Sequence, residues 1–352
     1  MRKSVFAAAL PVVLSIMLLG QQSAKDSKSS SETLRSYADK LDLLLGTVIQ
    51  GKFWSDPQYT ATLGREFNSG ASMELMHHTQ PQRGQFNFEN MDREIQFAKD
   101  HNMKLFGVAM VYRNDTAPPW LQFQAGCGHF SPAELDQILK NHIQTVIRHG
   151  GDTFYGWEVV NEPLDPAHNG CWTRVFGEEE LIAKAYRYAR EASPNTLLLL
   201  NESFGRQGID RPRVDQFFSL LKRLKSQGAP IDAAGIEMHL EAHQMRSDYV
   251  NEFKYFLEQA RRAGVQAHVT EMDVYQGPSG AFDKQKEIYY NILHTCLRDS
   301  NCKGFTLWGI SDTNAWHPIF KNLSDTKPLL FDEGYGKKAA YFGVLQALKE
   351  GR

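Results

Sequence analysis

The chain has 352 residues, and 39 Lys and Arg against 41 Asp and Glu leave a formal net charge of −2. Charge so evenly balanced lacks the excess of clustered basic residues that nucleic-acid binding requires, so we expect no nucleic-acid partner. Hydrophobic residues make up 42 % and charged residues 23 %, which is typical of a globular protein. The length allows two domains of about 150 residues or one larger barrel.

Residues 1–24 have the pattern of an export signal. A basic pair precedes an uncharged apolar run at residues 5–20, and small residues suited to cleavage follow. The run fits a cleaved signal peptide or an N-terminal membrane anchor, and a buried helix is the remaining alternative. Residues 25–32 read as a solvated Ser-rich tether. We therefore expect a secreted or periplasmic protein, with a membrane tether if the segment is retained.

Export changes the interpretation of the four cysteines. None forms a C-x-x-C pair or has the spacing of metal ligands. In an oxidising compartment disulfides are the first hypothesis, with the pairs Cys296–Cys302 and Cys127–Cys171. Four buried free thiols are the alternative.

Beyond residue 32, apolar runs of strand length alternate with amphipathic segments of helical period. The predicted strands are residues 44–49, 65–70, 104–111, 155–162, 196–203, 233–240, 266–274 and 304–311. The predicted helices include residues 90–101, 132–149, 178–193, 215–227, 248–264 and 285–298. Near-continuous apolar strands between helices indicate an α/β fold with a parallel sheet covered on both faces. Eight such units favour a closed (β/α)8 TIM barrel over an open sheet, and no nucleotide-binding glycine motif follows any strand.

Several of these strands end abruptly in acidic or polar residues, at the rim where the catalytic groups of such a barrel converge. Glu162 ends the fourth predicted strand, and Glu271 lies in the seventh. Two facing carboxyls suit glycosidic hydrolysis, because one protonates the leaving oxygen while the other, ionised, attacks the anomeric carbon. Asn161 can hydrogen-bond a sugar hydroxyl, and His239 with Asp273 can hold Glu271 ionised. Either glutamate alone could instead be a helix cap or a surface salt bridge.

Two segments resemble known signatures. Trp157–Pro163 (WEVVNEP) is similar to the acid/base signature of glycoside hydrolase family 10, the endo-β-1,4-xylanase family, and His268–Val274 (HVTEMDV) to its nucleophile signature. Further matches follow in the family's order at Glu66–Asn68, Gly84–Phe88, Ile231–Asp232, Gly304–Asp312, Trp316, Pro328–Asp332 and Lys337–Tyr341. The resemblance covers residues 40–348 and implies one catalytic domain at residues 33–352.

The resemblance implies a role for each matching residue. Glu162 would be the general acid/base and Glu271 the nucleophile of a retaining double displacement. His239 and Asp273 would form the hydrogen-bonded chain that holds Glu271, and Asn161 would support the acid/base side. A carboxylate pair completes this reaction, so we expect no metal and no organic cofactor. The spacing of Cys296 and Cys302 also recurs in many of these enzymes.

Departures from the family pattern concentrate at substrate contacts. The resemblance places substrate-binding residues at Asn68, Glu74, His77, Tyr112, Glu237, Trp308 and Trp316, although either tryptophan could instead pack in the core. His77 stands where the family has a lysine, Tyr112 where it has a tryptophan, and Glu237 where it has a glutamine. Val108 replaces a sugar-facing histidine. The chemistry is therefore better supported than the substrate, since a lost hydrogen-bonding group changes specificity strongly.

We therefore expect a monomeric retaining glycoside hydrolase that cleaves internal β-1,4-xylosidic bonds of xylan. One alternative is a hydrolase of another β-linked or decorated plant polysaccharide or oligosaccharide. Another is a non-catalytic carbohydrate-binding protein on a hydrolase scaffold. A neutral polysaccharide needs no electrostatic steering, which agrees with the small net charge.

Overall fold

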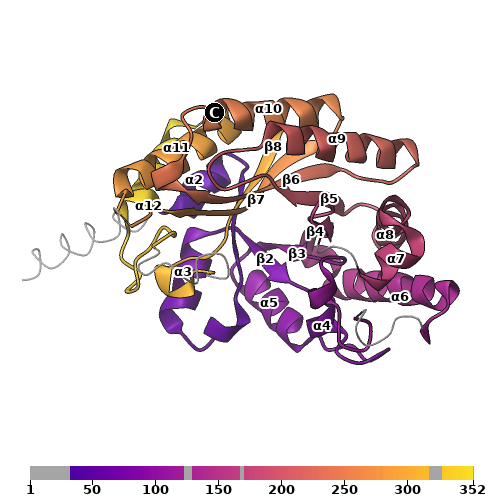
Figure 1. Ribbon diagram of the computed structural model, residues 1–352. Coiled ribbons are helices and arrows are strands. Elements are labelled where there is room, and N and C mark those ends of the chain that lie inside the picture. The colour runs from indigo at the N-terminus through magenta and orange to yellow at the C-terminus, as the bar shows by residue number, and fades with distance from the viewer. Residues whose placement is uncertain (1–31, 123–128, 167–169, 279, 317–326, 352) are drawn as a thin grey trace, which may run out of the picture.

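Eight parallel strands close into a barrel in chain order, and the eighth pairs with the first (Figure 1). The computed structural model describes residues 32–122, 129–166, 170–278, 280–316 and 327–351. The strands are β1 (Leu44–Val48), β2 (Ser69–Met73), β3 (Lys104–Val108), β4 (Phe154–Asn161), β5 (Leu197–Ser203), β6 (Ala233–Glu241), β7 (Gln266–Tyr275) and β8 (Cys302–Leu307). The predicted (β/α)8 barrel is confirmed.

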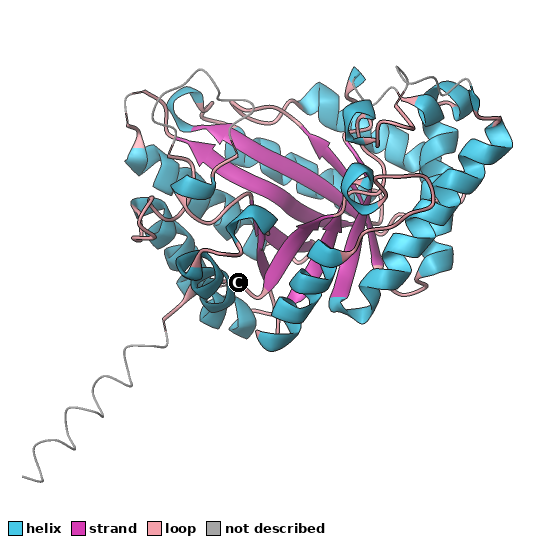
Figure 2. Cartoon of the chain, turned by 90° about the horizontal axis from the view of Figure 1, so that it is seen from below, coloured by secondary structure: helices cyan, strands magenta, loops and turns pink. Residues whose placement is uncertain are grey.

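Helices surround the strands on the outer face of the barrel (Figure 2). They are α2 (Leu34–Lys40), α3 (Pro57–Glu66), α4 (Met76–Thr79), α5 (Glu89–Asp100), α6 (Pro132–Gly150), α7 (Cys171–Phe176), α8 (Glu178–Ala192), α9 (Arg211–Ser226), α10 (Tyr249–Arg262), α11 (Phe282–Leu297) and α12 (Ala339–Glu350). Helix α6 shows why they begin where they do. The Ser131 hydroxyl accepts a hydrogen bond from the Glu134 amide, and the Glu134 carboxylate accepts one from the Ser131 amide. Pro132 occupies the first turn.

The second strand lies further along the chain than predicted. We expected a strand at residues 65–70, but α3 continues to Glu66 and β2 begins at Ser69. Asp56 caps α3 and a proline occupies its first turn, so the start of this helix is well specified. The β2 sequence, SGASM, is made of small side chains that carry little strand signal. The third and eighth strands also end earlier than predicted.

Apolar side chains fill the molecule in two layers. The larger cluster lies between the strands and the helices that cover them. A smaller cluster fills the inside of the barrel and includes Val48, Ala71, Phe106, Leu199, Ala233 and Trp308. Because the barrel interior is packed, the barrel is not a pore, and the catalytic groups of such a fold lie at its rim.

A buried carboxylate joins the first and last described helices. Glu66 is fully buried, and its Oε2 accepts from the Leu34 amide of α2 and from the Tyr341 hydroxyl of α12, both at 3.0 Å. Glu32, which the sequence assigned to the tether, pairs with Lys349 at 2.9 Å. The last residue of the predicted tether therefore contacts α12.

The disulfide predicted between Cys296 and Cys302 is present, with a Cα–Cα distance of 5.3 Å. It closes the turn from α11 to β8. Cys171 is also disulfide-bonded, and its expected partner, Cys127, lies outside the described residues. The alternative of four free thiols is therefore wrong.

The predicted export signal and all but the last residue of the predicted tether lie outside the described residues, so both stay predictions. Within the described ranges, no helix combines the length and the apolar character needed to cross a membrane.

Removing the Tyr341 hydroxyl tests the contact that joins α2 and α12. In Tyr341→Phe a buried oxygen of Glu66 loses a donor, and we expect the free energy of unfolding to fall by about 1–3 kcal/mol in urea denaturation. Tyr290→Phe is the matched control, because that hydroxyl donates to the exposed Glu350 at 2.6 Å and water can replace it. Equal losses in the two variants would contradict a special role for the buried contact.

Candidate active site

The register of β6 and β7 brings four titratable side chains together. Glu237 pairs with Glu271 across the two strands, and His239 pairs with Asp273. Residues two apart on a strand face the same side. The patterns E-x-H in β6 and E-x-D in β7 therefore present all four groups on one face.

His239 links two carboxylates. Its Nε2 lies 3.1 Å from Glu271 Oε2 and its Nδ1 lies 3.0 Å from Asp273 Oδ1. All three residues are at most 5 % exposed. Burial opposes a charge on His239, but Asp273 and Glu271 outweigh it and raise the pKa of His239 to about 10. The ring is therefore an imidazolium that donates from both nitrogens.

Glu271 is held between opposing effects. Burial raises the pKa of the Glu271 carboxyl, and the hydrogen bond from His239 opposes that rise. The contact also fixes the orientation of the carboxylate. The chain of hydrogen bonds expected from Glu271 through His239 to Asp273 is thus present.

Asn201 of β5 organises the adjoining wall of the site. Its Nδ2 donates to Asn161 Oδ1 and to Glu237 Oε1, both at 3.0 Å, and its Oδ1 accepts from the Thr270 hydroxyl at 2.7 Å. The side chain is fully buried. Sequence reasoning missed this residue, although an asparagine within the apolar run LLLLNES was a signal for it.

Gly235 of β6 makes room for that asparagine. A Cβ atom at Gly235 would lie 2.2 Å from Asn201 Oδ1 and 2.8 Å from Thr270 Cγ2, well inside van der Waals contact. Only glycine therefore fits beside Asn201 in this register.

Glu162 follows directly after β4 with a left-handed backbone, at φ 47°. Its amide donates to the Asn201 carbonyl at 3.0 Å, which anchors the turn. The half-buried side chain accepts a hydrogen bond from the Tyr112 hydroxyl at 2.6 Å. Burial and the charge of Glu162 strongly raise the pKa of Tyr112, so its phenol keeps the proton and remains a donor.

The two predicted sugar-binding tryptophans differ in exposure. Trp308 is 6 % exposed and belongs to the cluster inside the barrel, with its ring 6.2 Å from that of His239. Trp316 is 37 % exposed, and its ring lies 5.2 Å from that of His239. Trp316 is therefore the more accessible of the two tryptophans beside His239.

Asn68 is not a substrate contact, and that prediction is wrong. It immediately precedes β2, so it lies at the amino end of the barrel, opposite the catalytic rim. Its Nδ2 donates to Asp39 at 2.7 Å and to the Leu43 carbonyl at 2.9 Å, and its Oδ1 accepts from the Leu45 amide at 2.8 Å. The side chain joins α2 to β1.

Glu74 and His77 lie on the rim side of β2, but the described contacts do not tie them to Glu162 or Glu271. Glu74 accepts from the Ser72 hydroxyl at 2.6 Å, and burial raises the pKa of Glu74 to about 7. His77 Nδ1 lies 2.7 Å from the Thr116 carbonyl, which fixes the ring over the loop after β3. Their substrate-binding roles stay predictions.

The buried acid within β4 was missed. Glu158 is fully buried, and among the described residues neither of its carboxyl oxygens has a hydrogen-bond partner. Burial, followed by the charge of Glu271, raises the pKa of Glu158 well above its ordinary value. Glu158 is therefore a neutral acid near the site.

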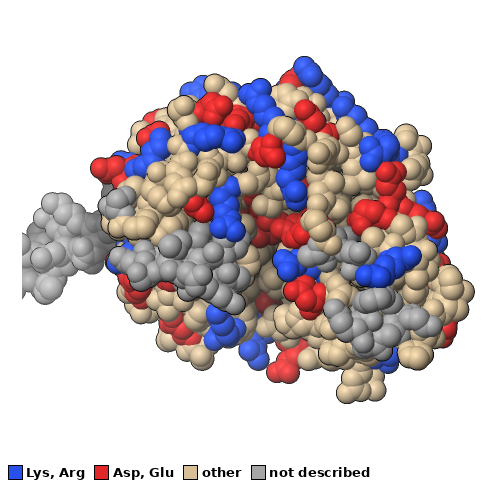
Figure 3. Space-filling model, viewed as in Figure 1, with Lys and Arg blue, Asp and Glu red and all other residues tan. Residues whose placement is uncertain are grey.

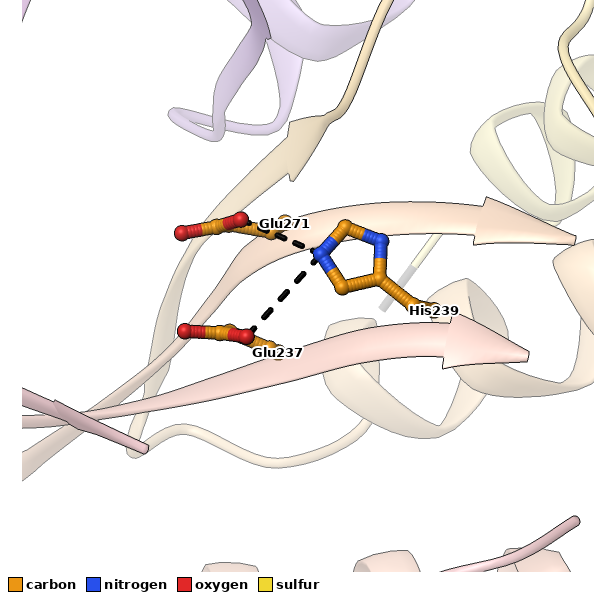
Figure 4. A group of neighbouring side chains, drawn as sticks. All are labelled: Glu237, His239 and Glu271. Carbon is orange, nitrogen blue, oxygen red and sulfur yellow. Dashed lines mark hydrogen bonds and ion pairs between the residues drawn. The ribbon is translucent and has the colours of Figure 1, made fainter. Parts of the chain in front are cut away.

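Glu237, His239 and Glu271 also have the positions of a possible metal cluster (Figure 4). One ligand atom from each lies within 4.8 Å of the others. A metal, however, requires the lone pair of a neutral imidazole. Both His239 nitrogens are occupied by donated bonds, so the residues fit a hydrogen-bonded acid network better than a metal centre.

Gly235→Ala tests whether the Asn201 network needs this close approach. The added methyl group must displace Asn201, and we expect the free energy of unfolding to fall by about 1–3 kcal/mol in urea denaturation. Gly334→Ala is the control, because its new Cβ would lie 3.5 Å from the nearest atom, Asp332 Oδ1, on the surface. An unchanged stability of Gly235→Ala would refute the close packing.

Comparison with known proteins agrees with this geometry. The sequence model of glycosyl hydrolase family 10 matches residues 33–347. Endo-1,4-beta-xylanase B of Thermotoga neapolitana is 32 % identical over 97 % of this chain and 98 % of its own length. Exoglucanase XynX of Acetivibrio thermocellus is also 32 % identical, over 77 % of this chain and 25 % of its own length.

A solved xylanase structure also resembles this chain. Xylanase 10B from Thermotoga petrophila, in complex with xylobiose, superposes with a TM-score of 0.81 at 29 % identity, covering 90 % of this chain and 97 % of that one. The predicted resemblance to this family is thus confirmed over nearly the whole folded domain, and the chain belongs to glycosyl hydrolase family 10.

Proposed function

We propose that the protein is a retaining endo-1,4-β-xylanase that hydrolyses internal β-1,4 bonds of xylan. The observation that carries the proposal is the buried hydrogen bond between the His239 imidazolium and Glu271. It supplies an oriented carboxylate at the rim of the barrel. A second, more accessible carboxyl, that of Glu162, follows directly after β4.

The first step forms a covalent ester. A Glu271 oxygen attacks the anomeric carbon, the bond from that carbon to the glycosidic oxygen breaks, and protonated Glu162 gives its proton to the departing oxygen. His239 and Asp273 keep Glu271 ionised and aligned before the attack. Glu162 is left as a carboxylate.

The second step returns the enzyme to its starting state. Glu162 takes a proton from a water molecule, whose oxygen attacks the anomeric carbon and displaces Glu271. Two inversions give net retention, and the overall reaction consumes only water. Asn161 is placed to assist, because its Oδ1 is already held by Asn201 and its amide nitrogen can donate to a sugar hydroxyl.

The relatives support xylan as the substrate. One is named an endo-1,4-beta-xylanase and matches nearly end to end, and a solved neighbour holds xylobiose. Positive and negative side chains are interspersed over the face of the molecule seen in Figure 3, which suits a neutral polymer. The export pattern in residues 1–24 supports secretion to where such polymers occur.

A second candidate is a hydrolase of another β-linked glycan. A relative named an exoglucanase favours it, as do the changes at His77, Val108 and Tyr112. A purely carbohydrate-binding role is less well supported, because it would not require the charged network around Glu271.

A substrate panel tests these alternatives. We expect faster release of reducing ends from xylan and arabinoxylan than from β-glucan or mannan. Glu271→Ala should lower the rate by at least about 10³-fold, because the nucleophile is lost. Faster cleavage of β-glucan would favour the second candidate. Binding without turnover of any polymer would contradict an enzymatic function.

Tyr112→Phe tests how Glu162 is positioned. Without the phenol, we expect kcat/KM for xylo-oligosaccharides to fall about tenfold, since a hydrogen bond to a charged group contributes about 1.5 kcal/mol or more. The fall should be smaller for an aryl xyloside whose leaving group needs no proton. Tyr255→Phe, which loses a contact with the exposed Asp215, should leave both rates unchanged. Equal losses with both substrates would contradict the positioning role.

A further inference from the structure

Glu237 and Glu271 form a close pair of buried carboxyls. They are partners in the register of β6 and β7, each is 5 % exposed, and carboxyl oxygens of the two lie within 4.8 Å (Figure 4). Two negative charges so close in a buried site cannot both be stable, so one carboxyl retains a proton. The family pattern has a permanently neutral glutamine where this chain has Glu237.

The hydrogen bonds decide which carboxyl holds the proton. His239 Nε2 lies 3.1 Å from Glu271 Oε2 but 3.9 Å from Glu237 Oε2, so the imidazolium favours a charge on Glu271. Glu237 Oε1 accepts from Asn201 Nδ2 at 3.0 Å. The acceptor role of Oε1 leaves Oε2, the oxygen on the His239 side, to carry the proton.

We propose that Glu237 is a positioning residue that works only as a neutral carboxylic acid, and that loss of its proton inactivates the enzyme at high pH. The protonated Oε2 of Glu237 supplies a hydrogen-bond donor beside Glu271, as the side-chain amide of a glutamine at this position would. The proton remains on Glu237 through both chemical steps and exchanges only with solvent. This inference rests on the proposed glycosidase function.

The surroundings of Glu237 favour the neutral form. The titratable groups that face it are Glu271 and Asp273 of β7, His239 of β6, Glu202 of β5, Glu158 and Glu162 of β4, and Tyr112 after β3. Of these groups, His239 alone is positive, and both of its ring nitrogens already donate hydrogen bonds, one to Glu271 and one to Asp273. Glu202 is paired with Arg213 at 2.8 Å. Burial, followed by the charges of Glu271 and Glu162, raises the pKa of Glu237 well above its ordinary value.

The kinetic test must separate Glu237 from Glu162, the proposed acid/base. A dinitrophenyl β-xylobioside needs no acid for departure of its leaving group, so in Glu162→Ala the value of kcat/KM reports on the remaining groups. We expect that variant to lose activity at high pH through loss of one proton. When Glu237→Gln is added, the pH at which kcat/KM falls should rise by at least about one unit, since an amide does not ionise.

Stability against pH provides a second readout. Glu237 is neutral in the fold but ionises in the unfolded chain above its ordinary pKa of 4.5. The unfolded state then binds fewer protons, so the wild-type free energy of unfolding decreases as pH rises from there toward the folded pKa. Glu237→Gln removes this contribution, and we expect a flatter dependence in urea denaturation.

Glu94→Gln is the matched control. Glu94 of α5 is buried, and burial with the charge of Glu74 raises the pKa of Glu94 to about 8. Its replacement should also flatten the stability curve but should leave the kinetic pH profile unchanged. A merely structural role for Glu237 would make the two variants behave alike.

Each outcome is decisive. An unshifted kinetic profile in Glu237→Gln would overturn the inference, and so would failure of that variant to fold, because a neutral acid and an amide have the same charge and shape. Failure of the proposed function would look different, since the wild-type protein would then turn over no β-glycan at any pH.

Discussion

The site depends on one positive charge, the buried imidazolium of His239. It lies between Glu271 and Asp273 and donates to both. Without it, Glu271 would be a buried carboxyl surrounded by acids and would take up a proton, as burial alone favours. The imidazolium also distinguishes Glu271 from Glu237, because its Nε2 lies 3.1 Å from Glu271 Oε2 but 3.9 Å from Glu237 Oε2. One hydrogen-bonded cation thus favours an ionised Glu271, the proposed nucleophile, over Glu237, the carboxyl that we propose stays neutral.

The rest of the fold keeps that cation in place. The two carboxylates that it bonds belong to β7 rather than to a loop, and the apolar cluster inside the barrel packs below them. Side chains on strands are held more accurately than side chains on loops. At the opposite end, Glu66 joins α2 to α12 and Asn68 joins α2 to β1. The amino end of the barrel therefore contributes contacts that stabilise the fold, and the carboxyl end carries the groups of the candidate active site.

Much of this organisation could be predicted from the sequence. The apolar strands ending in Asn161-Glu162 and running through Glu271 indicated both the barrel and its rim. β2 was misplaced because its small residues carry little strand signal. Asn68 was misassigned because a polar residue beside a strand does not reveal which end it occupies. The contacts of Asn201 depend on register between strands, which a single sequence does not contain.

If Glu271 is the nucleophile, as we propose, it forms a covalent bond with the sugar. A xylobioside with fluorine in place of the hydroxyl next to the anomeric carbon, and with a dinitrophenyl leaving group, slows both steps but the second more, so the ester accumulates. Mass spectrometry of the intact protein and of its proteolytic peptides locates the added sugar. We expect one sugar per chain, attached at Glu271. Attachment at Glu237, Glu162 or any other residue would contradict this expectation.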